Sequence, residues 1–342
     1  MLSLGQRLMF YFPAMIAASA FLARTALADV AGDLLVTDPN HARIIEVNPA
    51  TGVQTVFASG GYLQSPVGIA IGNSGAVVVS DNSNNRIISI NPTTGAQTLI
   101  TSLGATQRPL DIAVSPTNGN IIVAEATDNG GPGEVMQVNP ITGNTIVVSS
   151  GGNFITPWGI AIQANGSYLI GNRGSQASSN DGSLIVVNPT TGAQTVLVGS
   201  GSLLWTPDHE AIGVDGSIFV ADHDAPDGSG EIFNVNPTTG AQSLVSSGGY
   251  FDGGPGGIAI ANDGTLFVSE TNGGEILGIN PDTGGQTVIT SGGYFSSGIY
   301  GVGPEELAVV PVPEPAPLGM LLVGGAALLR RRASLRNGYG SN

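Results

Sequence analysis

Residues 86–100 read RIISINPTTGAQTLI, a run in which apolar and polar residues alternate on both sides of a turn. In the turn, which spans residues 91–95, Pro92 restricts φ to about −65° and Gly95 permits a positive φ. The alternation on each side is typical of a half-buried β-strand. The stretch therefore predicts a β-hairpin, two antiparallel strands joined by a tight turn.

The same turn motif, Asn-Pro-x-Thr-Gly, recurs along the chain at intervals of 43 to 49 residues. Two further short apolar runs precede each hairpin, as at residues 68–71 and 76–81 in the second repeat. Four short strands in about 45 residues is the period of a β-propeller blade. The motif begins at Asn48, Asn91, Asn139, Asn188, Asn236 and Asn280.

The two ends of the repeat array complement each other. Residues 33–38 read as a second strand that lacks its first, and residues 304–310 read as a first strand that lacks its second. An open array has no reason to divide one repeat between its ends, whereas a closed ring hides both sheet edges. We therefore predict an all-β, six-bladed β-propeller at residues 29–311, with the first blade closed by strand 304–310 beside strand 33–38.

The second repeat resembles an NHL repeat over Pro66-Val67-Gly68-Ile69 and the following residues up to Ile87. The whole body, residues 32–310, resembles the NHL, streptogramin-lyase and gluconolactonase-type propellers. This resemblance implies the six-bladed fold and, for the lyases and lactonases, a metal near the channel mouth. Function transfers less readily than fold, because the same architecture carries both enzymes and inert scaffolds.

Residues 1–28 have the three parts of a secretory signal peptide: Arg7, an apolar run, and small residues before the predicted cleavage after Ala28. Residues 312–333 resemble the PEP-CTERM sorting signal, because Pro313-Glu314-Pro315 is followed by a short apolar run and three arginines. A tail, residues 334–342, follows. The resemblance implies a Gram-negative bacterium, export through the Sec translocon, transient anchoring in the inner membrane, processing by an exosortase, and a final location at the cell surface or in the extracellular matrix.

The charge and the residue types exclude several classes of protein. Ten Lys and Arg residues face 25 Asp and Glu residues in the 342-residue chain, which gives a net charge of −15. Such a chain lacks the basic surface of a nucleic-acid-binding protein and attracts divalent cations. The absence of cysteine excludes disulfides, thiolate metal ligands and a cysteine nucleophile. We expect an acidic, soluble monomer after both ends are removed.

Ionisable residues alternate with glycines at the start of the innermost strands. At the second residue after the proline, every other blade carries an acid or a histidine, and Asp208 and Glu210 flank the histidine. A Glu, an Asp and a His at threefold spacing would suit Ca²⁺ or another divalent cation. No motif makes a cofactor certain. In ring order from the first blade, the residues are Glu306, Gly68, Asp111, Gly159, His209 and Gly257.

The fifth blade holds a second candidate cation site. Asp222, Asp224 and Asp227 crowd around glycines, as in a calcium-binding loop, but Asp227 is one residue out of the DxDxDG spacing. A solvated turn is the alternative interpretation.

Aromatic residues concentrate in the loops between blades. They could form a stacking surface for glycan rings, or they could wedge the blades together. The candidates for ligand binding are Tyr62, Trp158, Trp205, Tyr250 and Tyr294.

Two functions from different classes follow from these patterns. The favoured hypothesis is a non-catalytic binding module for a matrix component such as polysaccharide, with cation dependence. The alternative is a metal-dependent lactonase or streptogramin-lyase-like enzyme at the channel mouth, with His209 as general base. The sequence leans against catalysis, because the lactonase pattern is reduced to Pro207-Asp208 and His209 lies one place later than the lyase pattern requires. A purely structural matrix protein is a third interpretation.

Overall fold

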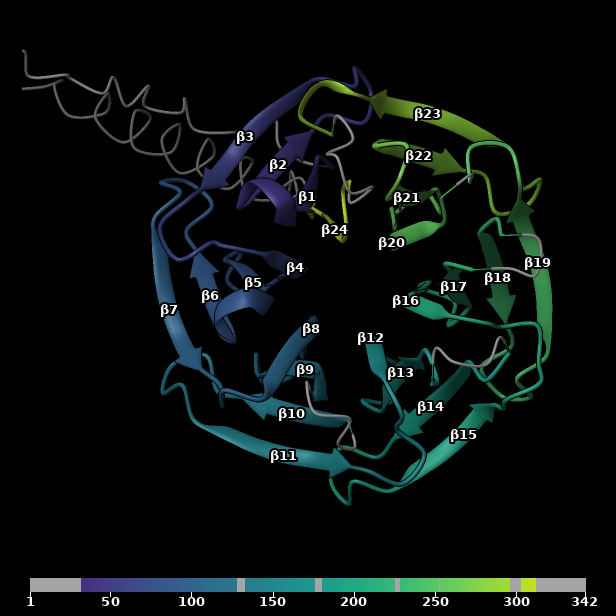
Figure 1. Cartoon of the computed structure of the whole chain (residues 1–342), viewed down its shortest axis with the longest axis horizontal. Coiled ribbons are helices and arrows are strands. Elements are labelled where there is room, and N and C mark those ends of the chain that lie inside the picture. Colours follow the sequence, from purple (N-terminus) through teal and green to yellow (C-terminus); the bar gives the residue numbers. More distant parts are fainter. Residues whose placement is uncertain are drawn as a thin grey trace, which may run out of the picture.

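The computed structural model describes residues 32–127, 133–175, 180–224, 228–251, 253–295 and 303–311. These residues form six four-stranded antiparallel sheets arranged as blades around a central axis (Figure 1). The predicted six-bladed propeller is therefore confirmed. The predicted signal peptide, the sorting segment 312–333 and the tail lie outside the described residues. Within the described part of the chain, no helix combines the length and the apolar character needed to span a bilayer.

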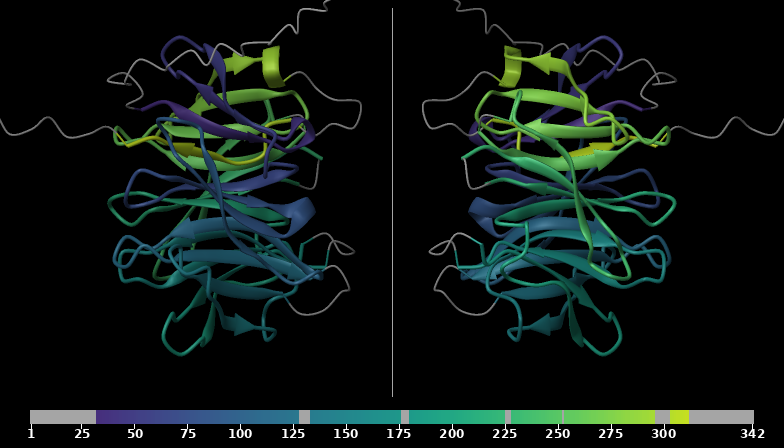
Figure 2. Two further views of the ribbon diagram at one scale, coloured as in Figure 1. Left: turned by 90° about the vertical axis from the view of Figure 1, so that its left-hand side faces the viewer. Right: turned by 90° about the vertical axis from the view of Figure 1, so that its right-hand side faces the viewer.

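Each blade is a meander whose strands run in order from the axis to the rim, and Figure 2 shows the wheel from two sides. Blade 1 contains β24 (Leu307–Val309), β1 (Leu34–Asp38), β2 (Arg43–Val47) and β3 (Gln54–Ser59), and blade 2 contains β4 (Pro66–Ile71), β5 (Val77–Asp81), β6 (Arg86–Ile90) and β7 (Gln97–Ser102). Blade 3 contains β8 (Gln107–Val114), β9 (Ile121–Thr127), β10 (Glu134–Val138) and β11 (Thr145–Ser150), and blade 4 contains β12 (Pro157–Ile162), β13 (Tyr168–Asn172), β14 (Ser183–Val187) and β15 (Gln194–Val198). Blade 5 contains β16 (Pro207–Ile212), β17 (Ile218–Asp222), β18 (Glu231–Val235) and β19 (Gln242–Ser247), and blade 6 contains β20 (Pro255–Ile260), β21 (Leu266–Glu270), β22 (Glu275–Ile279) and β23 (Gln286–Ser291).

Ring closure depends on the pairing of the two chain ends. β24 pairs antiparallel with β1, and Leu307 lies opposite Val36 while Val309 lies opposite Leu34. The predicted strand 304–310 is shorter in the structure, but its backbone hydrogen bonds extend further: the amide of Glu305 donates to Thr37, and the amide of Gly32 donates to Val310. The predicted closure of blade 1 is confirmed.

The core lies between neighbouring blades. Side chains of β2 and β3, such as Ile44 and Phe57, pack against Ile69 and Val79 of blade 2, and the other blade pairs repeat this arrangement. Burying one such aliphatic or aromatic side chain contributes about 1.5–3 kcal/mol. After five of the six outer strands, one buried apolar residue packs between its own blade and the next. This position confirms the wedge interpretation for the phenylalanines. These wedges are Leu63, Phe154, Leu204, Phe251 and Phe295.

The repeated turn joins neighbouring blades along the rim. The outer strands run head to tail around the circumference, so each turn lies beside the preceding outer strand (Figure 1). The Asn91 side chain accepts hydrogen bonds from the amides of Thr93 and Thr94, which closes the turn. Two residues beyond the turn, Gln97 accepts a hydrogen bond from the amide of Tyr62 and donates to the carbonyl of Gly60. The turn and the glutamine that follows it therefore also connect neighbouring blades through hydrogen bonds.

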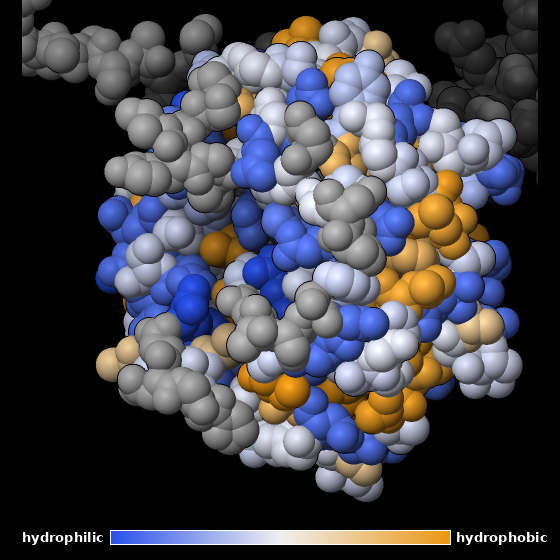
Figure 3. Space-filling view, turned by 45° about the vertical axis from the view of Figure 1, so that its right-hand side comes forward, coloured by the Kyte–Doolittle hydropathy of each residue, from blue (hydrophilic) through white to orange (hydrophobic). Residues whose placement is uncertain are grey.

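The rim of the wheel exposes apolar side chains. The space-filling view shows apolar surface gathered along one flank (Figure 3). The outer strands contain no charged residue, and β11, β15 and β19 expose Val147, Val196 and Leu244. The charge of the described part of the chain is therefore carried elsewhere than on these edge strands.

The turn glycines provide a test of this packing. Gly284 has a φ of +69°, and a Cβ atom there would meet the carbonyl oxygen of Val245 in the preceding outer strand. Gly264 has a φ of +88°, but a Cβ atom there would meet nothing within 4 Å. We expect Gly264→Ala to lower the free energy of unfolding by about 1–2 kcal/mol and Gly284→Ala by about 2–5 kcal/mol, because the second change adds a steric clash to the backbone strain. Denaturant unfolding measures both, and equal losses would contradict the proposed packing.

Candidate metal centre

Three ionisable side chains from alternate blades converge on the axis. Asp111 lies on β8, His209 lies on β16, and Glu306 directly precedes β24. In β8 and β16 these residues fall at an irregularity in the pairing of the inner strand, between Pro109 and Ile112 and between Pro207 and His209. One candidate ligand atom of each side chain lies within 4.8 Å of the others. The predicted alternation around the ring thus brings these three residues together.

The cluster is buried, and some of its polar atoms have no hydrogen-bond partner. Asp111 and Glu306 are each 5% exposed, and His209 is 1% exposed. Nε2 of His209 lies 2.8 Å from Oε2 of Glu306, although neither atom has a partner in hydrogen-bond geometry. The contact between them is therefore an ion pair, in which two polar atoms lie close together without a directed bond.

Backbone groups of the next blade orient two of the three side chains. Oδ2 of Asp111 accepts a hydrogen bond from the amide of Ile160 at 2.9 Å, and Oδ1 accepts one from its neighbour Ile112 at 2.6 Å. Nδ1 of His209 lies 3.0 Å from the carbonyl oxygen of Gly256. Because a carbonyl can only accept, Nδ1 carries a proton and Nε2 is the atom directed at the cluster. Such orientation of a histidine through its other nitrogen is typical of metal ligands.

Glycines on the intervening blades let the ligand-bearing strands approach. A Cβ atom on Gly68 would lie 2.6 Å from the carbonyl oxygen of Leu110, and one on Gly257 would lie 2.8 Å from that of Glu305. A Cβ atom on Gly159 would similarly meet the carbonyl oxygen of Asp208. The glycines in the predicted alternation therefore have a packing role, since each lies against the residue that precedes a cluster member.

Burial changes the protonation of the cluster. Burial raises the pKa of Asp111 to about 7, with the charge of His209 opposing the shift and that of Glu306 adding to it. Burial disfavours the charged form of His209, yet the carboxylates of Glu306, Asp111 and Asp208 together raise its pKa well above the usual value. The cluster therefore holds protons that a bound cation would displace.

Glu210 adds a further buried carboxyl group near His209. The residue is 7% exposed, and neither carboxylate oxygen has a hydrogen-bond partner. Its carboxylate occupies space left by Gly159 and Gly171, where a Cβ atom would collide with it. Burial raises the pKa of Glu210 well above its usual value, although the charge of His209 opposes the shift.

Asp208, also predicted as a ligand, faces away from the cluster toward Arg173. Both carboxylate oxygens accept hydrogen bonds from the Arg173 guanidinium, which lies over the Trp158 ring at 3.3 Å from its centroid. Sequence reasoning missed the role of Arg173. The available signal was its position directly after Asn172, at the end of a second strand where a charged residue could reach the next blade.

The predicted cation loop of blade 5 is organised around the backbone instead. Asp222 accepts hydrogen bonds from the amides of Trp205 at 2.7 Å and Thr206 at 2.6 Å, so it caps the loop before β16. The exposed Asp224 pairs with His223. Asp227 lies outside the described residues. A cation in this loop stays a prediction without geometric support.

The predicted aromatic surface is divided among separate junctions between blades. Tyr62, Tyr250 and Tyr294 are 38–45% exposed, and each lies just after a different outer strand. Arg86 lies over Tyr62, and Arg43 lies over Tyr294. Trp158 lies in β12, Trp205 lies just before β16, and both are half-buried. The candidate residues therefore lie at separate junctions between blades, and their role in stacking on glycan rings stays a prediction.

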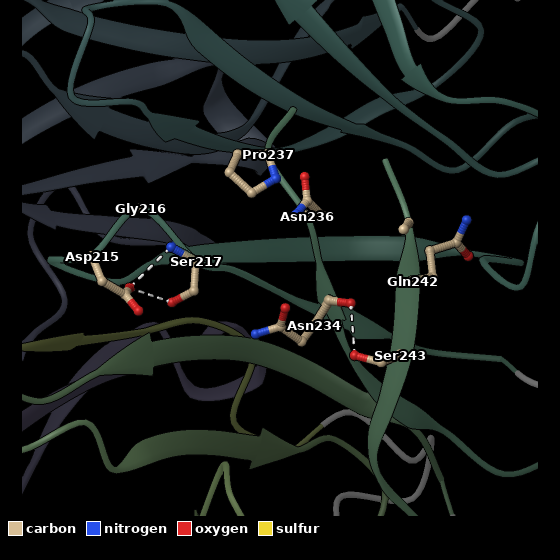
Figure 4. A pocket seen from close by; sticks show the side chains of 9 residues that line it. Asp215, Gly216, Ser217, Asn234, Asn236, Pro237, Gln242 and Ser243 are labelled. Carbon is tan, nitrogen blue, oxygen red and sulfur yellow. Dashed lines mark hydrogen bonds between the residues drawn. The ribbon is translucent and has the colours of Figure 1, made fainter. Parts of the chain in front are cut away.

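A polar hollow of about 450 Å³ lies away from the axis, between two turns of blade 5 (Figure 4). Asp215 borders it and accepts hydrogen bonds from the amide and hydroxyl of Ser217. These hydrogen bonds lower the pKa of Asp215 and satisfy its carboxylate. Cavity size therefore does not indicate the chemistry here, and the enclosed axial cluster is the better candidate site.

Comparison with known proteins supports the fold. Residues 63–88 match the NHL repeat. No curated protein matches the sequence significantly. Among solved structures, a chain of a nidogen–laminin complex is 12% identical with a TM-score of 0.64, covering 82% of this chain and 98% of that chain. A streptogramin B lyase is 16% identical with a TM-score of 0.58, covering 82% and 87%. A Bacteroides caccae protein of unknown function is 15% identical with a TM-score of 0.55, covering 82% and 99%.

These comparisons bear out two of the expectations drawn from the sequence. The predicted NHL resemblance in the second repeat is confirmed, and so is the structural likeness to streptogramin lyases. At these identities the likeness shows the fold alone, and the set includes both an enzyme and a component of a binding complex.

The Asp222 cap gives a pH-dependence that can be measured. Burial raises its pKa from 3.8 to about 7, although the amides of Trp205 and Thr206 oppose the shift. Because the folded state holds the proton more tightly, the contribution of Asp222 to stability is complete below about pH 4 and is lost as the pH rises through about 7.

Between about pH 4 and pH 7, we expect the free energy of unfolding of the wild type to fall by about 2–4 kcal/mol more than that of Asp222→Asn. Denaturant unfolding measures both. Asn172 accepts the corresponding two amides at 2.9 Å in blade 4, so asparagine can form this cap. Parallel pH profiles for the two proteins would contradict the raised pKa.

Proposed function

We propose that this protein is a non-catalytic, cation-dependent binding module, exported to the cell surface or extracellular matrix, with a divalent cation held on the propeller axis by Asp111, His209 and Glu306. The observation that carries the proposal is the convergence of these three buried side chains within 4.8 Å of one another. Export rests on the signal patterns at the two ends of the sequence.

The donor set suits a divalent cation. Two carboxylates and one imidazole nitrogen supply negative charge and three ligands, and Nε2 of His209 and Oε2 of Glu306 have no hydrogen-bond partner. Buried, unsatisfied charged groups destabilise a fold unless a counter-ion or proton compensates them. The imidazole suits Zn²⁺ and the two carboxylates suit Mn²⁺, whereas Ca²⁺ prefers an all-oxygen shell.

The enclosure of the cluster favours a structural cation over a catalytic one. A catalytic metal keeps a coordination position open for water or substrate, whereas a structural metal is surrounded by protein. Here the most exposed of the three residues is 5% exposed. Ligand binding is therefore assigned to the surface of the wheel, which the cation would stabilise, and an extracellular polysaccharide is the proposed ligand.

Cation binding is tested by metal analysis and thermal unfolding of the full-length protein. At a cation concentration of 100 times Kd, stabilisation is about 2.7 kcal/mol, which raises Tm of a propeller of this size by roughly 3–6 °C. We expect Mn²⁺ or Zn²⁺ to raise Tm, a chelator to reverse the effect, and His209→Ala or Asp111→Asn to abolish it. Asp81→Asn is the matched control, because Asp81 caps the amides of Gln64 and Ser65 away from the cluster.

The proposal predicts that retention on extracellular polysaccharide falls when the chelator is added and recovers with the cation. A Tm that responds to neither cation nor chelator would overturn the cation centre. If neither cation nor chelator changes retention on polysaccharide, ligand binding does not depend on the cation centre.

A second candidate function is a metal-dependent lyase or lactonase at the same centre. The observation that favours it is Nε2 of His209, which has no partner in hydrogen-bond geometry and, once it has lost its proton, could act as a general base beside Glu306. The non-catalytic proposal predicts no turnover when the Mn²⁺- or Zn²⁺-supplemented protein is incubated with a streptogramin B or a simple lactone and the products are followed by mass spectrometry. Product formation that disappears in His209→Ala would favour the enzyme instead.

A further inference from the structure

The innermost strand of blade 1 is shorter than the corresponding strand of every other blade. β24 has three residues, whereas β4, β12, β16 and β20 have six each and β8 has eight. β24 is also supplied by the opposite end of the chain from the other three strands of its blade. The closure of the ring therefore rests on its shortest inner strand.

Glu306 couples this strand to the axial cluster. Its amide donates a hydrogen bond to Oγ1 of Thr37, and its carbonyl accepts one from the amide of Thr37, so the backbone of Glu306 is part of the closure. Its side chain extends to Asp111 of blade 3 and His209 of blade 5. Neither of those blades is next to blade 1 in the ring, so the cluster is a connection across the axis.

The strength of that connection depends on what occupies the cluster. In the described structure, Glu306 reaches blade 5 only through the ion pair with His209, at 2.8 Å and outside hydrogen-bond geometry. A divalent cation bound by all three side chains would replace this contact with coordination bonds to three blades at once. Metal binding of this kind contributes its free energy to the folded arrangement.

We infer that the axial cation locks the ring, holding Glu306 and therefore β24 to blades 3 and 5, and that loss of the cation frees the closing strand. This inference rests on the cation centre of the proposed function.

Hydrogen exchange of the full-length protein tests the lock. We expect Mn²⁺ or Zn²⁺, compared with chelator, to slow exchange about tenfold or more in peptides covering residues 32–38 and 303–311, because local opening of β24 becomes rarer. Peptides covering β14 and β15 of blade 4 serve as the internal reference and should change little. Asp111→Asn should remove the effect at β24. Asp111 accepts its hydrogen bonds from Ile112 and Ile160, which are not part of β24, so the loss would act through the cation.

The matched control is Glu305→Gln, which removes the neighbouring acid of the same segment and should retain the effect. Calorimetry on the same samples measures cation binding independently of strand opening. Cation binding without slower exchange at β24 would overturn the lock and leave the cation centre in place. No cation binding would overturn both.

Discussion

The antiparallel pairing of β24 with β1 is the constraint on which the rest of this structure depends. Each blade buries apolar side chains against its two neighbours, so the interfaces of blade 1 with blades 2 and 6 are incomplete until the ring is closed. Three residue pairs, from Leu34 opposite Val309 to Val36 opposite Leu307, provide that closure at the inner edge of blade 1. At the rim, Gln54 adds to it by bonding Thr290 and the amide of Tyr294 in blade 6.

Closure also creates the electrostatic situation at the axis. It places Glu306 beside His209 and Asp111, in surroundings that exclude water from all three. Buried carboxylates without sufficient hydrogen-bond donors must take up protons or a cation. The glycines on the alternate blades belong to the same arrangement, because side chains at Gly68, Gly159 or Gly257 would prevent the strands from approaching closely enough to form the cluster.

Much of this arrangement could be predicted because it repeats. Six copies of one turn motif indicated six blades, and the divided repeat at the two ends indicated how the ring closes. The alternation of acids or histidine with glycine identified Asp111, His209 and Glu306 as a set. The same reasoning did not distinguish Asp208 from its neighbours, because its partner Arg173 is 35 residues away in another blade. It also grouped the loop tyrosines as one set, and only the structure shows that each lies at a separate junction between blades.

The sequence by itself therefore determined the number of blades, the order of their strands and the register that brings Glu306 into the ring, because these properties follow from local periodicity and spacing. Only the tertiary structure decided which polar side chains contact one another at the axis, and which instead form hydrogen bonds with the backbone or an ion pair elsewhere. Asp222 and Asp111 are both buried acids that accept hydrogen bonds from two backbone amides, yet Asp222 only caps the loop before β16, whereas Asp111 also faces a histidine from a distant blade. That difference depends on distances across the axis, which no local pattern of residues encodes.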